Sequence, residues 1–160
     1  MLRSAVRTLL VLAAAPLASL AAQAPAQPVT STGAARFHAG NPTSPLSSIV
    51  EVGNTLYLSG MLGTGADGQL APGGIEAETK LTMENIRTAL RRVGATMDDV
   101  VKCTVFLADM AERDRMNAIY VTFFPTHKPA RSAVGVNGLA RNARVEIECL
   151  AVRGAGAPAR

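Results

Sequence analysis

Arg131 and two glutamates downstream of it are the residues best placed to do chemistry in this chain. Arg131 opens an apolar run just after a proline, and Glu146 and Glu148 alternate with apolar residues in a later run. Because side chains alternate between the faces of a strand, the two glutamates share one face with Arg144. One interpretation is a solvated sheet face with weak surface ion pairs. The other is an anion site, in which Arg131 binds a carboxylate through two parallel hydrogen bonds and an acid acts as general base.

Residues of the metal-ligating types are few and widely spaced. The histidines are His38 and His127, and the cysteines are Cys103 and Cys149. Without the close spacing of zinc ligands, these four residues predict no metal site. Both cysteines fall in apolar runs, where they could form a disulfide in an oxidising compartment or remain two buried thiols. The chain also lacks the glycine-rich nucleotide-binding patterns and the G-x-S-x-G pattern.

Apolar patterns predict the strands that position these residues. Two runs around a Gly-Asn pair predict a β-hairpin over residues 49–59. Glycines mark residues 60–74 as a loop. Runs of β-branched and apolar residues predict further strands over residues 100–107, 131–136 and 145–152.

Two helices are expected between these strands. Apolar residues at helical spacing predict one helix from near Ile75 to Gly94, and a second after a capping box at Asp109 and Glu112, ending at Pro125. The resulting order predicts an α+β or mixed α/β layer, one sheet with both helices on one face. No third helix is expected to cover the other face, so we expect a partner subunit there.

Residues 1–24 have the order of a secretory signal peptide. A short start with Arg3 and Arg7 precedes an apolar core over residues 8–20, and small residues follow. The core is shorter than the ~20 residues that span a bilayer. We therefore expect cleavage near Ala24, or after Ala21 or Ala22, in preference to a retained anchor or a buried helix. The mature protein is then periplasmic or secreted, with no membrane attachment. Residues 25–36 are expected to form a flexible leader, 37–153 the domain and 154–160 a disordered tail.

From residue 37 to residue 153 the sequence resembles the reactive intermediate deaminase family, also called RidA or YjgF-type proteins. The shared segments are Val52-Gly53-Asn54 followed by Leu58-Ser59-Gly60, Met83-Glu84-Asn85-Ile86, residues 101–107, residues 116–120, Phe123-Phe124, Pro129-Ala130-Arg131-Ser132 and Val145-Glu146-Ile147-Glu148. The resemblance implies a single-domain, chorismate-mutase-like α+β fold. Three subunits would pack their sheets into a central barrel, as a homotrimer with clefts between neighbours. It also implies hydrolysis of 2-imino and 2-enamino acids, such as the tautomers of 2-aminoacrylate, to 2-keto acids and ammonia, with no metal and no organic cofactor.

The resemblance also implies roles for individual residues. Arg131 corresponds to the arginine that binds the substrate carboxylate, and Glu146 to the acid that orients or activates the attacking water. Ser59 and the Gly60 backbone line the cleft in the family.

Other positions are less specific or depart from the family pattern. Ala133 stands where many members have a cysteine and use main-chain groups to bind the imine nitrogen. Asn117 and Tyr120 match recurrent residues, with helix packing and capping as the alternative role, and Glu148 is expected to be structural. Leu46 stands where many members carry a cleft tyrosine, which leaves a more apolar pocket and an altered substrate preference.

Composition limits the alternative functions. Of the 16 basic residues, removal of Arg3 and Arg7 with residues 1–24 leaves 14 against 12 acidic ones, a net charge of +2. Aromatic residues make up only 4% of the chain. Some members of the family are described as endoribonucleases, but this chain offers little phosphate attraction and few stacking platforms, so we expect no nucleic-acid partner. A non-catalytic protein that binds small carboxylates in the same cleft is the other alternative.

Overall fold

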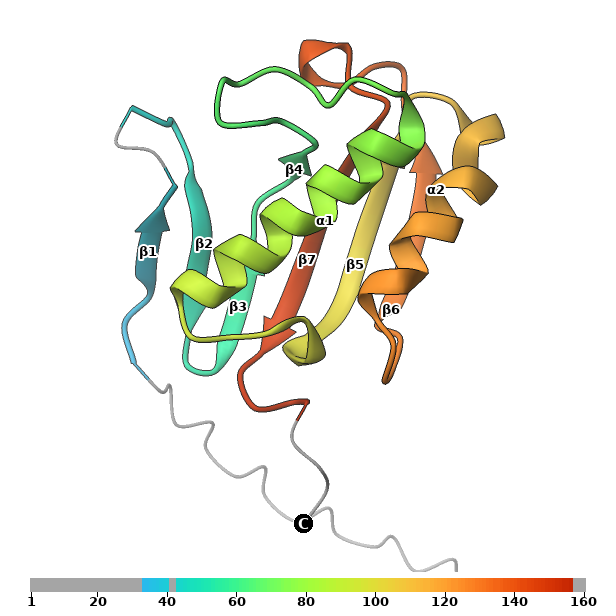
Figure 1. The fold of residues 1–160 in the computed structure, drawn as a ribbon. Coiled ribbons are helices and arrows are strands. Elements are labelled where there is room, and N and C mark those ends of the chain that lie inside the picture. Colours follow the sequence, from blue (N-terminus) through green and yellow to red (C-terminus); the bar gives the residue numbers. More distant parts are fainter. Residues whose placement is uncertain (1–32, 41–42, 157–160) are drawn as a thin grey trace, which may run out of the picture. The chain divides into compact units, whose positions relative to one another are not determined.

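The computed structural model describes residues 33–40 and 43–156; the predicted signal peptide and most of the predicted leader lie outside these residues. Figure 1 shows a sheet with its helices on the same face. The strands are β1 Arg36–Ala39, β2 Ser47–Val52, β3 Thr55–Leu58, β4 Met61–Leu62, β5 Val100–Leu107, β6 Ala130–Gly135 and β7 Val145–Val152. The helices are α1 Ile75–Arg92 and α2 Arg113–Tyr120, and the 3₁₀ turns are η1 Met97–Asp99, η2 Met110–Glu112, η3 Val121–Phe123 and η4 Ala140–Asn142.

The sheet is mixed, and its strands run in the order β1-β2-β3-β7-β5-β6. β3 pairs with the last residues of β7, and β4 pairs with its first residues. All pairs are antiparallel except β5 and β6, which run parallel with Cys103 opposite Arg131. A parallel pair needs a crossover connection, and α2 provides it.

The core lies between the sheet and the two helices. Ile75, Met83, Ile86 and Leu90 form one stripe along α1, and all four are fully buried. They pack in one cluster with inward-facing strand residues such as Val105. Each such side chain contributes about 1.5–3 kcal/mol by leaving water. Within the described ranges, no helix has the length and apolar character needed to cross a membrane.

The other face of the sheet is open in the single chain. Tyr57 is 49% exposed there and Val134 is 42% exposed, with Lys102 and Glu148 between them. A shallow hollow of about 380 Å³ lies on this face, bordered by Tyr57, Lys102, Thr104, Glu148 and Leu150. The face therefore combines exposed apolar side chains with charges of both signs.

The expected α+β layer with both helices on one face is confirmed, and most elements fall where the sequence predicts. Strands β5 and β7 match their predicted ranges, and α1 begins at Ile75. Gly94 takes a φ of +71° just beyond the end of α1, as expected of a residue that ends a helix.

Three features differ from the sequence prediction. β4 lies in the segment expected to be loop, and β1 begins at Arg36 with little apolar character. The second helix is divided, because the Asp109 side chain accepts a hydrogen bond from the Ala111 amide and begins a 3₁₀ turn before α2. Both missed strands are too short to show a clear alternation of apolar and polar residues.

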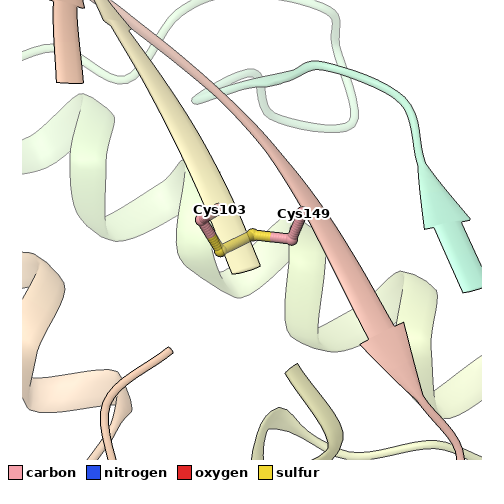
Figure 2. The surroundings of a disulfide bond; sticks show 2 residues. All are labelled: Cys103 and Cys149. Atoms are coloured by element: carbon pink, nitrogen blue, oxygen red, sulfur yellow. A yellow bond between two sulfur atoms is a disulfide. The ribbon is translucent and has the colours of Figure 1, made fainter. Parts of the chain in front are cut away.

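A disulfide joins the two central strands of the sheet. Cys103 of β5 and Cys149 of β7 are directly opposite each other, with Cα atoms 4.1 Å apart. Figure 2 shows the bond bridging the two strands on the side of the helices. Both residues are buried, at 0% and 3% exposure. Of the two alternatives left by the sequence, the structure therefore selects the disulfide.

Candidate active site

Arg131 lies on the helix-covered face of the edge strand β6. It is opposite Cys103, so its side chain leaves the sheet toward α2. There its guanidinium carbon lies 4.8 Å from the centre of the Tyr120 ring. A cation held over an aromatic face is attracted by the ring and loses rotational freedom. The stack leaves the edge N–H groups of Arg131 able to donate to a planar anion.

Two buried polar atoms of α2 belong to this part of the molecule. The hydroxyl of Tyr120 and Oδ1 of Asn117, one helical turn earlier, have no hydrogen-bond partner among the described residues. Burial raises the pKa of Tyr120 to about 12, although the charge of Arg131 acts in the opposite direction. The phenol is therefore neutral near pH 7 and can donate or accept a hydrogen bond. Unpartnered buried polar atoms are rare, which marks both as candidates for ligand contact.

Ala133 follows two residues after Arg131 and faces the same way. Its side chain packs against the core, opposite Val105. β6 is the last strand in the described sheet, so one edge of its backbone has no neighbouring strand. Main-chain groups along that edge are therefore open to a ligand or to another chain.

Glu146 lies on the opposite, open face of the sheet, near the start of β7. It pairs with Phe106 on one side and with Leu62 on the other. Gly60 comes so close that a Cβ placed on it would lie 2.9 Å from the Glu146 carboxyl carbon, and closer still to Oε1. Glycine is thus the residue that fits beside this carboxylate. The adjoining Ser59 donates its hydroxyl to the Ser47 carbonyl oxygen at 2.7 Å, which ties this segment to the start of β2.

The structure therefore separates the predicted site residues into two groups within one chain. Arg131, Ala133, Asn117 and Tyr120 form the first group, on the helix side. Ser59, Gly60 and Glu146 form the second group, toward the open face. Arg131 and Glu146 lie on strands that follow each other in the sequence, but β5 lies between β6 and β7 and the two side chains point to opposite faces. One chain alone does not bring them together.

The start of β7 is fixed by ion pairs that the sequence does not indicate. Arg144 turns away to Glu112 of η2 and donates to its carboxylate at 2.8 Å and 2.5 Å. The Arg144 amide donates to Oε2 of Glu78, in α1, at 2.8 Å. Glu112 is only 6% exposed and also lies 3.5 Å from Arg115. These contacts hold the backbone two residues before Glu146.

The remaining chemistry-bearing residues have other partners. His38 contacts Glu51 at 3.1 Å, and His127 contacts the Asp98 carbonyl oxygen at 2.8 Å. No cluster of three or more His, Cys, Asp or Glu side chains is found in the described part of the chain. Glu148 lies on the open face, bordering the hollow there.

A larger hollow lies away from both groups. It has a volume of about 640 Å³ and lies between the stripe Lys80, Glu84, Arg87 and Arg91 of α1 and the Ile119–Pro125 segment. Arg87 there pairs with Glu84 and lies over Phe123. None of the predicted site residues borders this hollow, so its size alone does not make it the active site.

Comparison with known proteins gives consistent matches over the domain. The sequence profile of a family described as endoribonuclease L-PSP matches residues 37–153. A 2-iminobutanoate/2-iminopropanoate deaminase of Mus musculus is 44% identical over 111 residues, which are 69% of this chain and 82% of that protein. RidA from the Antarctic bacterium Psychrobacter sp. PAMC 21119 is 34% identical, with a TM-score of 0.66 over 70% of this chain and 91% of that chain. E. coli TdcF, solved with bound serine, is 30% identical, with a TM-score of 0.65 over 69% of this chain and 89% of that chain.

Proposed function

The chain belongs to the endoribonuclease L-PSP family, the family of RidA and YjgF-type proteins, and we propose that it is a hydrolytic deaminase of small 2-imino and 2-enamino acids. Its products are the 2-keto acid and ammonia. The observation that carries the proposal is Arg131, stacked on Tyr120 beside two unpartnered buried polar atoms. The relatives named as deaminases of 2-iminobutanoate and 2-iminopropanoate support this substrate class, because both compounds are small carboxylates.

The residues can divide the reaction between them. Arg131 binds the substrate carboxylate through two parallel hydrogen bonds. Glu146 accepts a proton from water as the oxygen attacks C2 of the protonated imine, forming a C–O bond. Glu146 returns this proton to the nitrogen of the tetrahedral adduct. Ammonia then leaves as the C–N bond breaks, and the hydroxyl group loses its proton to solvent as the C=O bond forms. An enamine first takes up a proton at C3, which gives the same imine. No step changes the total oxidation state.

A complete site requires a second copy of the chain. Arg131 and Glu146 point to opposite faces of one sheet, so a cleft that holds both takes one residue from each of two chains. We propose a homotrimer in which the open faces meet and each cleft joins the Arg131 group of one subunit to the Glu146 group of its neighbour. The exposed Tyr57 and Val134 on the open face support this packing, since burying them removes apolar surface from water.

Export of the protein is part of the proposal. The signal-peptide pattern of residues 1–24 favours it, and so does the Cys103–Cys149 disulfide, because structural disulfides are typical of oxidising compartments. Intact mass of the protein recovered from the periplasm or medium tests this. A mature product that begins within residues 22–25 is expected, and a full-length reduced protein in the cytosol would contradict it.

Turnover is tested with an imine made in situ. An amino-acid oxidase generates the 2-imino acid, and semicarbazide traps whatever survives. Active protein lowers the trapped yield. Arg131→Ala should lower the catalytic efficiency by at least 10-fold, because a lost charge-assisted hydrogen bond costs about 1.5–3 kcal/mol. Glu146→Gln should lower kcat with less effect on KM. Arg92→Ala, at an exposed position of α1, is the matched control.

Mixed subunits test the shared cleft. When Arg131→Ala and Glu146→Gln subunits are refolded together in equal amounts, random assembly pairs an intact Arg131 with an intact Glu146 at about a quarter of the sites. Activity near a quarter of wild type is the expected result. If both residues acted from one chain, the mixture would stay as inactive as either variant.

The alternative function, a non-catalytic binding protein, has its own test. It would be identified if a small carboxylate raised the unfolding temperature of the wild type while no turnover was detected.

A further inference from the structure

β4, a very short strand, carries the segment beside Glu146. It consists of Met61 and Leu62, and Leu62 is the residue that pairs with Glu146. Gly60, which closely approaches the Glu146 carboxylate, immediately precedes it. A two-residue strand makes too few ladder hydrogen bonds to fix this approach, so its position depends on what else it contacts.

Asn85 of α1 supplies that contact. Its side-chain nitrogen Nδ2 donates to the Leu62 carbonyl oxygen and to the Thr64 carbonyl oxygen, both at 3.0 Å. One amide group thereby joins the end of β4 to the second residue beyond it, Thr64. α1 lies over the sheet at β4 (Figure 1). Asn85 is in the middle of this 18-residue helix, so the amide donor is held on a long, regular element.

A second contact brings the same segment against α1. A Cβ placed on Gly63, between the two carbonyls that Asn85 binds, would lie 2.8 Å from the Glu78 Cα and closer still to its carbonyl oxygen. The backbones therefore touch here. The Glu78 side chain in turn accepts the Arg144 amide at the start of β7. Thus α1 fixes both segments that flank Glu146, β4 through Asn85 and β7 through Glu78.

We propose that Asn85 is a positioning residue for the hydrolytic half of the site, which sets the distance between the Gly60 segment and the Glu146 carboxylate. The inference rests on the proposed function, because it assigns Glu146 the activation of water. Asn85 touches neither Glu146 nor the Arg131 group in the described contacts, so it acts through β4. Its loss should impair the chemical step and leave binding of the substrate carboxylate intact.

The test compares two variants of Asn85 with two control variants, all made in the mature protein. Asn85→Ala removes both hydrogen bonds, and Asn85→Asp keeps the side-chain shape but replaces the donor by an oxygen. Thr88→Ala, at an exposed position three residues further along α1, controls for substitution in the helix. Ile86→Val removes one buried methyl group next to Asn85 and controls for loss of stability. The readouts are kcat and KM in the imine-trapping assay, and the unfolding temperature.

We expect kcat to fall 10- to 100-fold in both Asn85 variants, with KM within 3-fold of wild type, since a shift of about 1 Å in a catalytic group has an effect of this size. Ile86→Val should lower the unfolding temperature but keep kcat within 2-fold. The inference is overturned if the Asn85 variants lose stability as Ile86→Val does and keep their kcat, or if KM rises while kcat stays constant. If Glu146→Gln were itself fully active, the proposed function and this inference would both fail. If only Glu146→Gln were impaired, this inference alone would fail.

Discussion

Refolding the protein under reducing conditions should lower its free energy of unfolding by about 4 kcal/mol, because the Cys103–Cys149 bond then no longer restricts the unfolded chain. The two cysteines are 46 residues apart in the sequence. The entropy removed from an unfolded chain by closing a loop of that length is worth about 4 kcal/mol at 25 °C. Both sulfur atoms stay in the core after reduction, so the packing of the folded state changes little.

The measurement is urea unfolding followed by circular dichroism. Oxidised protein is compared with protein that was denatured, reduced and refolded in the presence of a phosphine reductant. Both samples have equal chain concentration, because the stability of an oligomer depends on concentration. The reduced form should unfold at lower urea and with a steeper slope, since an unfolded chain without the cross-link exposes more surface. The double variant Cys103→Ala/Cys149→Ala should be insensitive to reductant.

Two results would refute this reasoning. One is an unchanged midpoint in samples whose alkylation pattern shows two free thiols after reduction. The other is a native, never-reduced protein in which both cysteines are alkylated upon unfolding, because the bond would then be absent from the folded protein.

Three further predictions concern single side chains. Gly60→Ala should reduce kcat at least 10-fold with a small change in unfolding temperature. The reason is that the added methyl group displaces the Glu146 carboxylate and not a backbone segment. Full activity in the trapping assay would contradict the placement of Glu146. Tyr120 has a pKa of about 12 in the folded state against an ordinary value of 10, so the unfolded chain loses this proton first as the pH rises. The contribution of Tyr120 to the free energy of unfolding is complete below pH 10 and declines by about 1–3 kcal/mol between pH 10 and 12. In urea unfolding at these pH values, Tyr120→Phe should lose correspondingly less stability than the wild type. Equal losses would argue against a buried phenol. Arg144→Met should lower the free energy of unfolding, because it leaves the nearly buried Glu112 with the weaker partner Arg115. Adding Glu112→Gln should recover part of that loss, and strictly additive effects of the two substitutions would show that the pair is not coupled.

Much of the fold follows from local patterns in the sequence. Val100–Leu107 and Val145–Val152 are rich in β-branched and apolar residues, and the sequence predicts both strands because such runs are typical of buried strands. The start of α1 near Ile75 likewise follows from the end of the glycine-rich loop at Gly74. β1 and β4 are not predicted from the sequence. β1 is an exposed edge strand of four residues and β4 has two residues, so both depend on their partner strands and show no periodicity of their own.

The geometry of the site needed information that no local pattern contains. Alternation along β7 correctly separates Glu146 from the buried Ile147. Whether Arg131 lies on the same face of the sheet as Glu146 depends on its register against Cys103, which is on a different strand. The same register decides the disulfide, which sequence spacing alone left open. The two hydrogen bonds of Asn85 join segments more than 20 residues apart, and an asparagine within a helix gives no sign of its partner.

The crossover from β5 through α2 to β6 has a consequence for how this protein can change. Asn117, Tyr120, Arg131 and Ala133 all lie within that single continuous stretch of chain, whereas Gly60 and Glu146 belong to distant ones. If the proposed roles hold, substitutions confined to this stretch can change which acid is recognised without altering Gly60 or Glu146, the residues proposed to activate water. In laboratory evolution, libraries restricted to residues 116–134, with Arg131 kept, should yield variants with altered preference among imines.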